Sequence, residues 1–124
     1  GLGAAVVISI GSGGAWAEGG DAKAGKKVFK RCVACHNYNK EKNKVGPHLI
    51  DIVGRKAGIV EKFKYSKSLL KMAEADSLVW SKENLDKYLT KPKKFIPRGK
   101  MAFAGLKKED DIENVIAYIK ANGG

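Results

Sequence analysis

Cysteine and histidine are scarce in this chain, which limits the disulfides and metal sites that it can form. The 124 residues contain two cysteines and two histidines. Cys32 and Cys35 lie three positions apart, so a disulfide between them would close a very small loop and cross-link nothing distant. A segment with strict period-two alternation is also missing, which argues against β-strands. No internal repeat is present, so one compact domain is expected.

Charge is missing from the first 17 residues. They are apolar from Leu2 to Ile10 and end in Ala15-Trp-Ala17, which matches the A-x-A cleavage pattern of a secretory signal peptide. We therefore expect residues 1–17 to be a signal-peptide remnant and residues 18–124 to be the mature domain. The alternative is a short uncleaved membrane anchor, but a transmembrane helix needs about 20 apolar residues and this stretch is interrupted by glycines.

Acidic residues are few. The chain has 13 Asp and Glu against 24 Lys and Arg, which gives a formal net charge of +11. Only three of the 24 basic residues are arginine. Lysine is a hydrated point charge that suits loose, salt-sensitive encounters better than bidentate reading of bases. The composition therefore favours an acidic protein partner over nucleic acid, for which the sequence has no recognised motif.

Apolar residues with helical spacing dominate the mature domain, and the expected helices are 22–34, 66–73, 82–90 and about 107–122. Asp21 and Ser81 are suitable N-caps for two of them. Residues 37–58 are polar and loop-like. The stretch 91–100 contains two prolines and is expected to be an extended loop that leads to Met101. The expected class is all-α, with long loops wrapped around a bound group.

One motif carries recognisable chemistry, namely Cys32-Val-Ala-Cys35-His36. It is the C-x-x-C-H arrangement for c-type haem attachment, in which two thiols meet the vinyl groups and the imidazole lies under the iron. A thioredoxin-like redox pair is an alternative, but it requires a βαβ background that is missing here. Half of a zinc site is another, but outside the motif only His48 adds a histidine and no cysteine remains. Covalent haem attachment is the favoured interpretation.

A haem held only by His36 would have an open sixth position, and two methionines could fill it. Met72 lies inside an expected helix, where a packing role is more common. Met101 follows the proline-containing loop and is the better candidate. A thioether ligand stabilises ferrous iron and raises the potential, which suits an electron carrier more than an oxygen-activating enzyme. His48 is expected to be an ordinary surface residue.

The sequence resembles the class I cytochromes c, most closely the mitochondrial cytochrome c and bacterial cytochrome c2 branch. The likeness covers nearly all of residues 21–122, and the matching segments are 25–29, 32–36, 46–47, 54–58, 63–65, 80, 88–89, 92–97, 100–101 and 115–118. It implies the small, single-domain, all-α class I cytochrome c fold. Helices and long loops would wrap around one covalently bound haem c with its iron.

The resemblance also implies roles for individual residues. His36 and Met101 would be the axial ligands of the iron, and the Pro47 carbonyl would accept a hydrogen bond from the His36 ring. The other residues implied at the haem are Arg55, Tyr65 and Trp80, near its propionates, and Tyr88, beside the Met101 sulfur. In the first helix, Gly25 and Phe29 would pack against Val115 and Tyr118 of the last one.

The chain departs from the family pattern in two places. The family usually has Pro-Gly-Thr-Lys-Met, whereas this chain has Pro97-Arg98-Gly99-Lys100-Met101. The threonine hydroxyl near the propionate is therefore lost, and Gly99 is expected to loosen the loop and weaken methionine ligation. The segment between Tyr65 and Trp80 is also longer than in the short mitochondrial type, and it has no clear match for the asparagine often present there.

By resemblance, the protein is a soluble mono-haem electron carrier, not an enzyme, in a respiratory or photosynthetic chain. Its partners would be acidic docking surfaces on a cytochrome bc1 complex as donor and on a terminal oxidase or photosynthetic reaction centre as acceptor. The basic residues that match the family's docking ring are Lys27, Arg31, Lys44, Lys93, Lys94, Lys100, Lys107 and Lys108.

The expected location is the bacterial periplasm, where the protein would be a monomer, or would be tethered to the membrane if the leader is retained. An alternative function is a haem peroxidase-like enzyme, which would require Met101 to leave the iron. The sequence offers no evident distal acid-base group for that chemistry.

Overall fold

The computed structural model describes residues 19–124, so the expected leader and its cleavage site after Ala17 lie outside the described residues. Five helices are present in this range, and they are α2 (Ala22–Phe29), α3 (Lys67–Ala75), α4 (Lys82–Thr90), α5 (Pro92–Phe95) and α6 (Glu109–Ala121). Extended pairing within residues 19–124 is limited to one antiparallel bridge between Lys56 and Val79. The all-α class is thereby confirmed. None of the helices in the described range is long and apolar enough to cross a membrane.

Three helices begin at side-chain caps. Asp21 caps α2 by accepting hydrogen bonds from two backbone amides. Ser66 caps α3 and Ser81 caps α4, and each hydroxyl accepts from the backbone amide three residues later at 3.1 Å. Such caps satisfy amides that have no partner inside the helix. As a result, α4 has the expected bounds, and α3 ends two residues later than expected.

Two expected elements differ from the structure. α2 ends at Phe29 instead of continuing to residue 34, because the chain then winds into tight turns in which the Cys32 amide bonds to the Phe29 carbonyl at 2.7 Å. The stretch 91–100 is not all loop, since α5 begins at Pro92. Proline is well suited to a first helical position, where its missing N–H would have no intrahelical partner.

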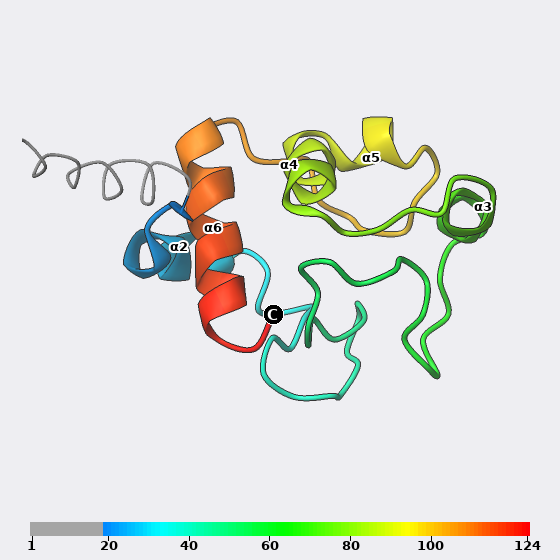
Figure 1. Cartoon of the computed structure of the whole chain (residues 1–124), viewed down its shortest axis with the longest axis horizontal. Coiled ribbons are helices and arrows are strands. Elements are labelled where there is room, and N and C mark those ends of the chain that lie inside the picture. The colour runs from blue at the N-terminus through cyan, green and yellow to red at the C-terminus, as the bar shows by residue number, and fades with distance from the viewer. Residues whose placement is uncertain (1–18) are drawn as a thin grey trace, which may run out of the picture.

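α2 and α6 come from opposite ends of the described chain and pack against each other (Figure 1). Gly25 allows the close approach, since a Cβ there would overlap the Asn114 carbonyl and the Tyr118 Cβ. At the end of α2, the Phe29 ring lies 5.7 Å from the Tyr118 ring, measured between centroids. The expected pairing of Gly25 and Phe29 with the last helix is therefore confirmed.

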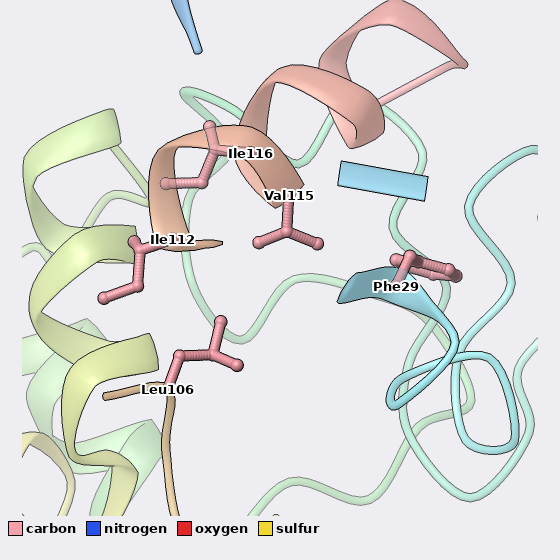
Figure 2. Packing of buried hydrophobic residues seen from close by; sticks show 5 residues of the cluster. All are labelled: Phe29, Leu106, Ile112, Val115 and Ile116. Carbon is pink, nitrogen blue, oxygen red and sulfur yellow. The ribbon is translucent and has the colours of Figure 1, made fainter. Parts of the chain in front are cut away.

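Within residues 19–124, the buried side chains form two clusters. The first, shown in Figure 2, joins α2, α6 and the segment before α6, and consists of Phe29, Leu106, Ile112, Val115 and Ile116. The second lies mainly among the loops and consists of Ile52, Ala57, Leu78, Trp80 and Ile96. Leu85 of α4 packs against both clusters. α4 therefore packs between the two clusters.

Candidate functional site

The two cysteines and His36 lie in the turns that follow α2. The backbone amides of Cys35 and His36 both donate to the Cys32 carbonyl at 3.0 Å, which keeps the motif compact. Both thiols are free and half-buried. Burial raises the pKa of the Cys32 thiol, although the nearby Arg31 cation acts in the opposite direction. The turns after α2 therefore hold two free thiols beside the imidazole of His36.

A neighbouring loop fixes the imidazole of His36. Its Nδ1 lies 2.7 Å from the Pro47 carbonyl oxygen. Because a carbonyl only accepts, this contact assigns the ring proton to Nδ1 and leaves the Nε2 lone pair for a metal ion. Gly46 permits the approach, since a Cβ at this position would collide with the His36 ring. The Gly46 amide also donates to the Cys35 carbonyl at 2.8 Å.

The surroundings of His36 favour its neutral form. Burial lowers the pKa of the imidazole, and the positive charges of Arg55 and Lys44 lower it further. The hydrogen bond to the Pro47 carbonyl acts in the opposite direction. Metal ions bind the neutral imidazole, so the environment favours the form that can be a ligand.

Met101 is half-buried and has a tyrosine beside its sulfur. The Tyr88 hydroxyl donates to Met101 Sδ at 3.8 Å. Burial raises the pKa of Tyr88 to about 12, so the hydroxyl keeps its proton at neutral pH. The Tyr88 ring also packs against Trp80, with centroids 4.9 Å apart. Met72, by contrast, packs against the second buried cluster, as expected for a core residue.

The Arg55 guanidinium donates to two loop carbonyls, and within residues 19–124 its Nε has no acceptor. Its Nη1 donates to the carbonyls of His48 and Ile50 at 3.0 and 2.9 Å. Its Nε is buried and has no hydrogen-bond partner among residues 19–124. Burial lowers the pKa of Arg55, and the nearby Tyr65 and Asp51 act in the opposite direction.

Tyr65 lies close enough to Arg55 to affect the pKa of its guanidinium, and Trp80 contacts the Arg55 backbone. The Tyr65 hydroxyl accepts a hydrogen bond from the Val60 amide at 3.1 Å. The backbone amide of Trp80 donates to the Arg55 carbonyl at 2.8 Å. The structure therefore brings together Arg55, Tyr65 and Trp80, and through the Trp80 ring it joins them to Tyr88 and the methionine.

The eight basic residues expected at the docking surface are all exposed. Three of them also bond to backbone carbonyls: Lys44 to Val33, Lys93 to Gly99 and Lys100 to Lys64. These three lysines therefore stabilise loops around the site and also contribute to its positive charge.

The loop before Met101 has hydrogen bonds at Gly99, the residue that is expected to loosen it. The Gly99 amide donates to the Ile96 carbonyl at 3.0 Å, and the Gly99 carbonyl accepts from Lys93 Nζ. Arg98 has a φ of 64°, in the left-handed region that favours glycine. Arg98 therefore stands in a strained conformation where the family has glycine. Gly99, which follows it, is hydrogen-bonded through both its amide and its carbonyl.

Sequence reasoning missed two contributors to this site. From the sequence, Gly46 was noted only as part of segment 46–47, which matches the family, although glycine is common where the backbone approaches another group closely. Ser68 was not singled out at all. Its hydroxyl donates to the Pro97 carbonyl, 29 positions away. A contact of that range leaves no local pattern in the sequence.

The cytochrome c family model matches residues 22–122. The chain belongs to the cytochrome c family. Cytochrome c2 of Afifella marina is 47% identical over 98 residues, which are 78% of this chain and 78% of that protein. Cytochrome c type-1 of Ascaris suum is 47% identical over 102 residues, or 82% and 88%. Among solved structures, cytochrome cH from Methylobacterium extorquens has a TM-score of 0.73 at 41% identity, covering 82% of this cytochrome c and 99% of that chain.

As a class I cytochrome c, the protein is a mono-haem electron carrier that shuttles electrons between complexes. It carries one covalently attached haem c, and Cys32 and Cys35 fit the CXXCH motif. The residues present suit this group. Both thiols are free, and the Pro47 contact leaves His36 Nε2 for the iron. The buried, unpaired Nε of Arg55 is a donor that a haem carboxylate would satisfy.

Proposed function

We propose that Cys32 and Cys35 form the two thioether bonds to the haem, and that His36 and Met101 are the axial ligands of its iron. The observation that carries this assignment is the 2.7 Å contact between His36 Nδ1 and the Pro47 carbonyl. It orients an imidazole, beside two free thiols, with Nε2 left for the metal. The bound haem supplies one-electron chemistry between ferric and ferrous iron.

Arg55, Tyr65 and Trp80 hold the haem propionates in this proposal. The unpaired Nε of Arg55 supports it, because a buried guanidinium donor without an acceptor is unfavourable. Tyr65 accepts from the Val60 amide and so keeps its own hydroxyl proton to donate. Tyr88 supports Met101 from α4 through the hydrogen bond to its sulfur.

The ligand assignment is tested by comparing the wild-type holoprotein with Met101→Ala. Removal of the thioether should open the sixth position, change the ferric spectrum from low-spin to high-spin and lower the reduction potential. Met72→Ala is the matched control, because Met72 packs in the second buried cluster, and it should leave the spectrum unchanged. An unchanged spectrum in Met101→Ala would show that another residue holds the iron.

The role is that of a carrier and not of an enzyme, within a respiratory or photosynthetic chain. We propose a cytochrome bc1 complex as donor and a terminal oxidase or photosynthetic reaction centre as acceptor, each docking through an acidic surface. The net charge of +11 and the exposure of all eight basic residues of the expected docking surface support such partners. A peroxidase-like activity would require Met101 to leave the iron, and the Tyr88 contact to its sulfur favours the carrier.

The proposed location is the bacterial periplasm, with residues 18–124 as a monomeric mature protein. The uncharged leader pattern in residues 1–17 supports it. Mass spectrometry of the exported protein should find a chain that begins at Glu18. A retained leader together with membrane association would instead support the tethered form.

A further inference from the structure

The loop that carries Met101 is tied to the protein on both sides of Arg98. On one side, the Ser68 hydroxyl of α3 donates to the Pro97 carbonyl. On the other side, Lys100 Nζ donates to the Lys64 carbonyl at 2.6 Å. Both partners outside the loop come from the segment around the start of α3. These two hydrogen bonds therefore tie the loop that leads to Met101 to that segment.

α3 is itself held firmly enough to serve as an anchor. Ser66 is buried and caps its first turn, which fixes the backbone next to Ser68. Leu69 and Met72 of α3 pack against the second buried cluster. That cluster contains Ile96, which is fully buried and directly precedes Pro97. The helix and the base of the loop thus share one core, and the Ser68 hydrogen bond joins them at its edge.

We propose that Ser68 is a positioning residue for Met101, which holds the loop closed by its hydrogen bond to the Pro97 carbonyl. The proposal rests on the proposed ligation by Met101. It also gives a function to the lengthened segment between Tyr65 and Trp80, which contains α3. A hydroxyl from this segment compensates for the threonine that the loop lacks and for the strain at Arg98.

The test measures how readily imidazole in solution replaces Met101 in the ferric holoprotein. An external ligand binds only when the loop opens, so its apparent affinity is its intrinsic affinity multiplied by the open fraction. Ser68→Ala removes one neutral hydrogen bond from the closed state and should raise the apparent imidazole affinity about fivefold. Ser68→Thr keeps a hydroxyl at this position and should restore the wild-type affinity.

A matched control separates positioning from general loss of stability. Asp21→Ala removes the N-cap of α2, whose helix packs against α6 away from the loop. It should lower global stability in denaturant but leave the imidazole affinity unchanged. If Asp21→Ala raises the affinity as much as Ser68→Ala does, or if Ser68→Ala leaves it unchanged, the positioning role is wrong.

The double variant distinguishes failure of this proposal from failure of the ligand assignment. In a Met101→Ala background no thioether has to be displaced, so adding Ser68→Ala should leave imidazole affinity unchanged. A fivefold effect that persists in this background would contradict positioning of Met101 by Ser68. Wild-type protein that binds imidazole as tightly as Met101→Ala does would instead overturn the ligand assignment itself.

Discussion

Gly46 and Pro47 act on His36 from the same loop. Pro47 offers its carbonyl to Nδ1, and Gly46 lacks the side chain that would otherwise occupy the space of the ring. The Gly46 amide also bonds to the Cys35 carbonyl, so the loop is attached directly to the cysteine motif. The tautomer and the orientation of the His36 imidazole are therefore set by backbone atoms.

Gly46→Ala should disrupt this arrangement. The added methyl group overlaps the His36 ring, so either the loop or the ring has to move, at a cost of about 1–3 kcal/mol typical of overpacking. We expect lower stability in denaturant and a smaller fraction of chains with correctly ligated haem. Gly19→Ala is the control, because a Cβ there meets no atom of the described residues 19–124 within 4 Å. Equal stability of the two variants would contradict the close approach at Gly46.

The backbone conformation of Arg98 determines how a substitution at this position changes stability. Its φ of 64° costs a non-glycine residue about 1 kcal/mol. Arg98→Gly should therefore raise the free energy of unfolding by about 0.5–1 kcal/mol, even though glycine makes the unfolded chain more flexible. Arg98→Ala removes the same charge without relieving the strain, and chemical denaturation should show no gain. A gain of the same size in both variants would assign the effect to charge.

At the scale of elements, the contact between α2 and α6 holds together the two ends of the described chain. Gly25 lies at the closest approach, and Phe29, Val115 and Ile116 belong to the buried cluster beside it. This packing supports the turns of the cysteine motif, because they begin where α2 ends.

The sign of the stability change in Gly25→Ala shows whether helix packing or helix propensity dominates at this position. Propensity alone predicts that alanine in a helix interior stabilises by about 1 kcal/mol. The structure predicts the opposite, a loss of about 1–3 kcal/mol, because the Cβ would overlap the Asn114 carbonyl across the interface. Thermal or denaturant unfolding measures the change. A stabilised Gly25→Ala variant would show that the helices are not in close contact.

Elements with local signals were predictable from the sequence. Ser81 caps α4 where expected, because an N-cap depends only on a side chain and the amides that follow it. The end of α2 and the presence of α5 could not be predicted from the sequence, because helical and turn conformations compete closely in short segments. The cysteine motif is local as well. The pairing of Ser68 with Pro97 depends on how α3 and the loop pack, and no short pattern encodes it.

For the whole molecule, the dominant property is a net charge of +11. Many of its lysines lie exposed around the loops that carry the site. Such a charge attracts an acidic partner over distances comparable with the Debye length, which is about 10 Å at 0.1 M ionic strength. Electrostatics therefore acts on the rate of encounter, before any specific contact forms.

Second-order electron-transfer rates with an acidic protein partner should fall several-fold as ionic strength rises from low salt past about 0.1 M, because added ions screen the attraction. Stopped-flow absorbance at the haem bands follows the reaction. The control is a small neutral reductant, whose rate should change little over the same range. A flat salt profile with the acidic partner would rule out steering.

One short segment, residues 32–36, is proposed to bind the haem through two cysteines and a histidine. The exported protein is unfolded in guanidinium chloride with a thiol-free reductant at about pH 8, where free thiols react readily, and is treated with a thiol-alkylating reagent. Mass spectrometry of the product then tests the attachment. We expect the mass of the chain plus one haem, with neither Cys32 nor Cys35 alkylated. A chain without haem that carries an alkyl group on both cysteines would contradict the claim.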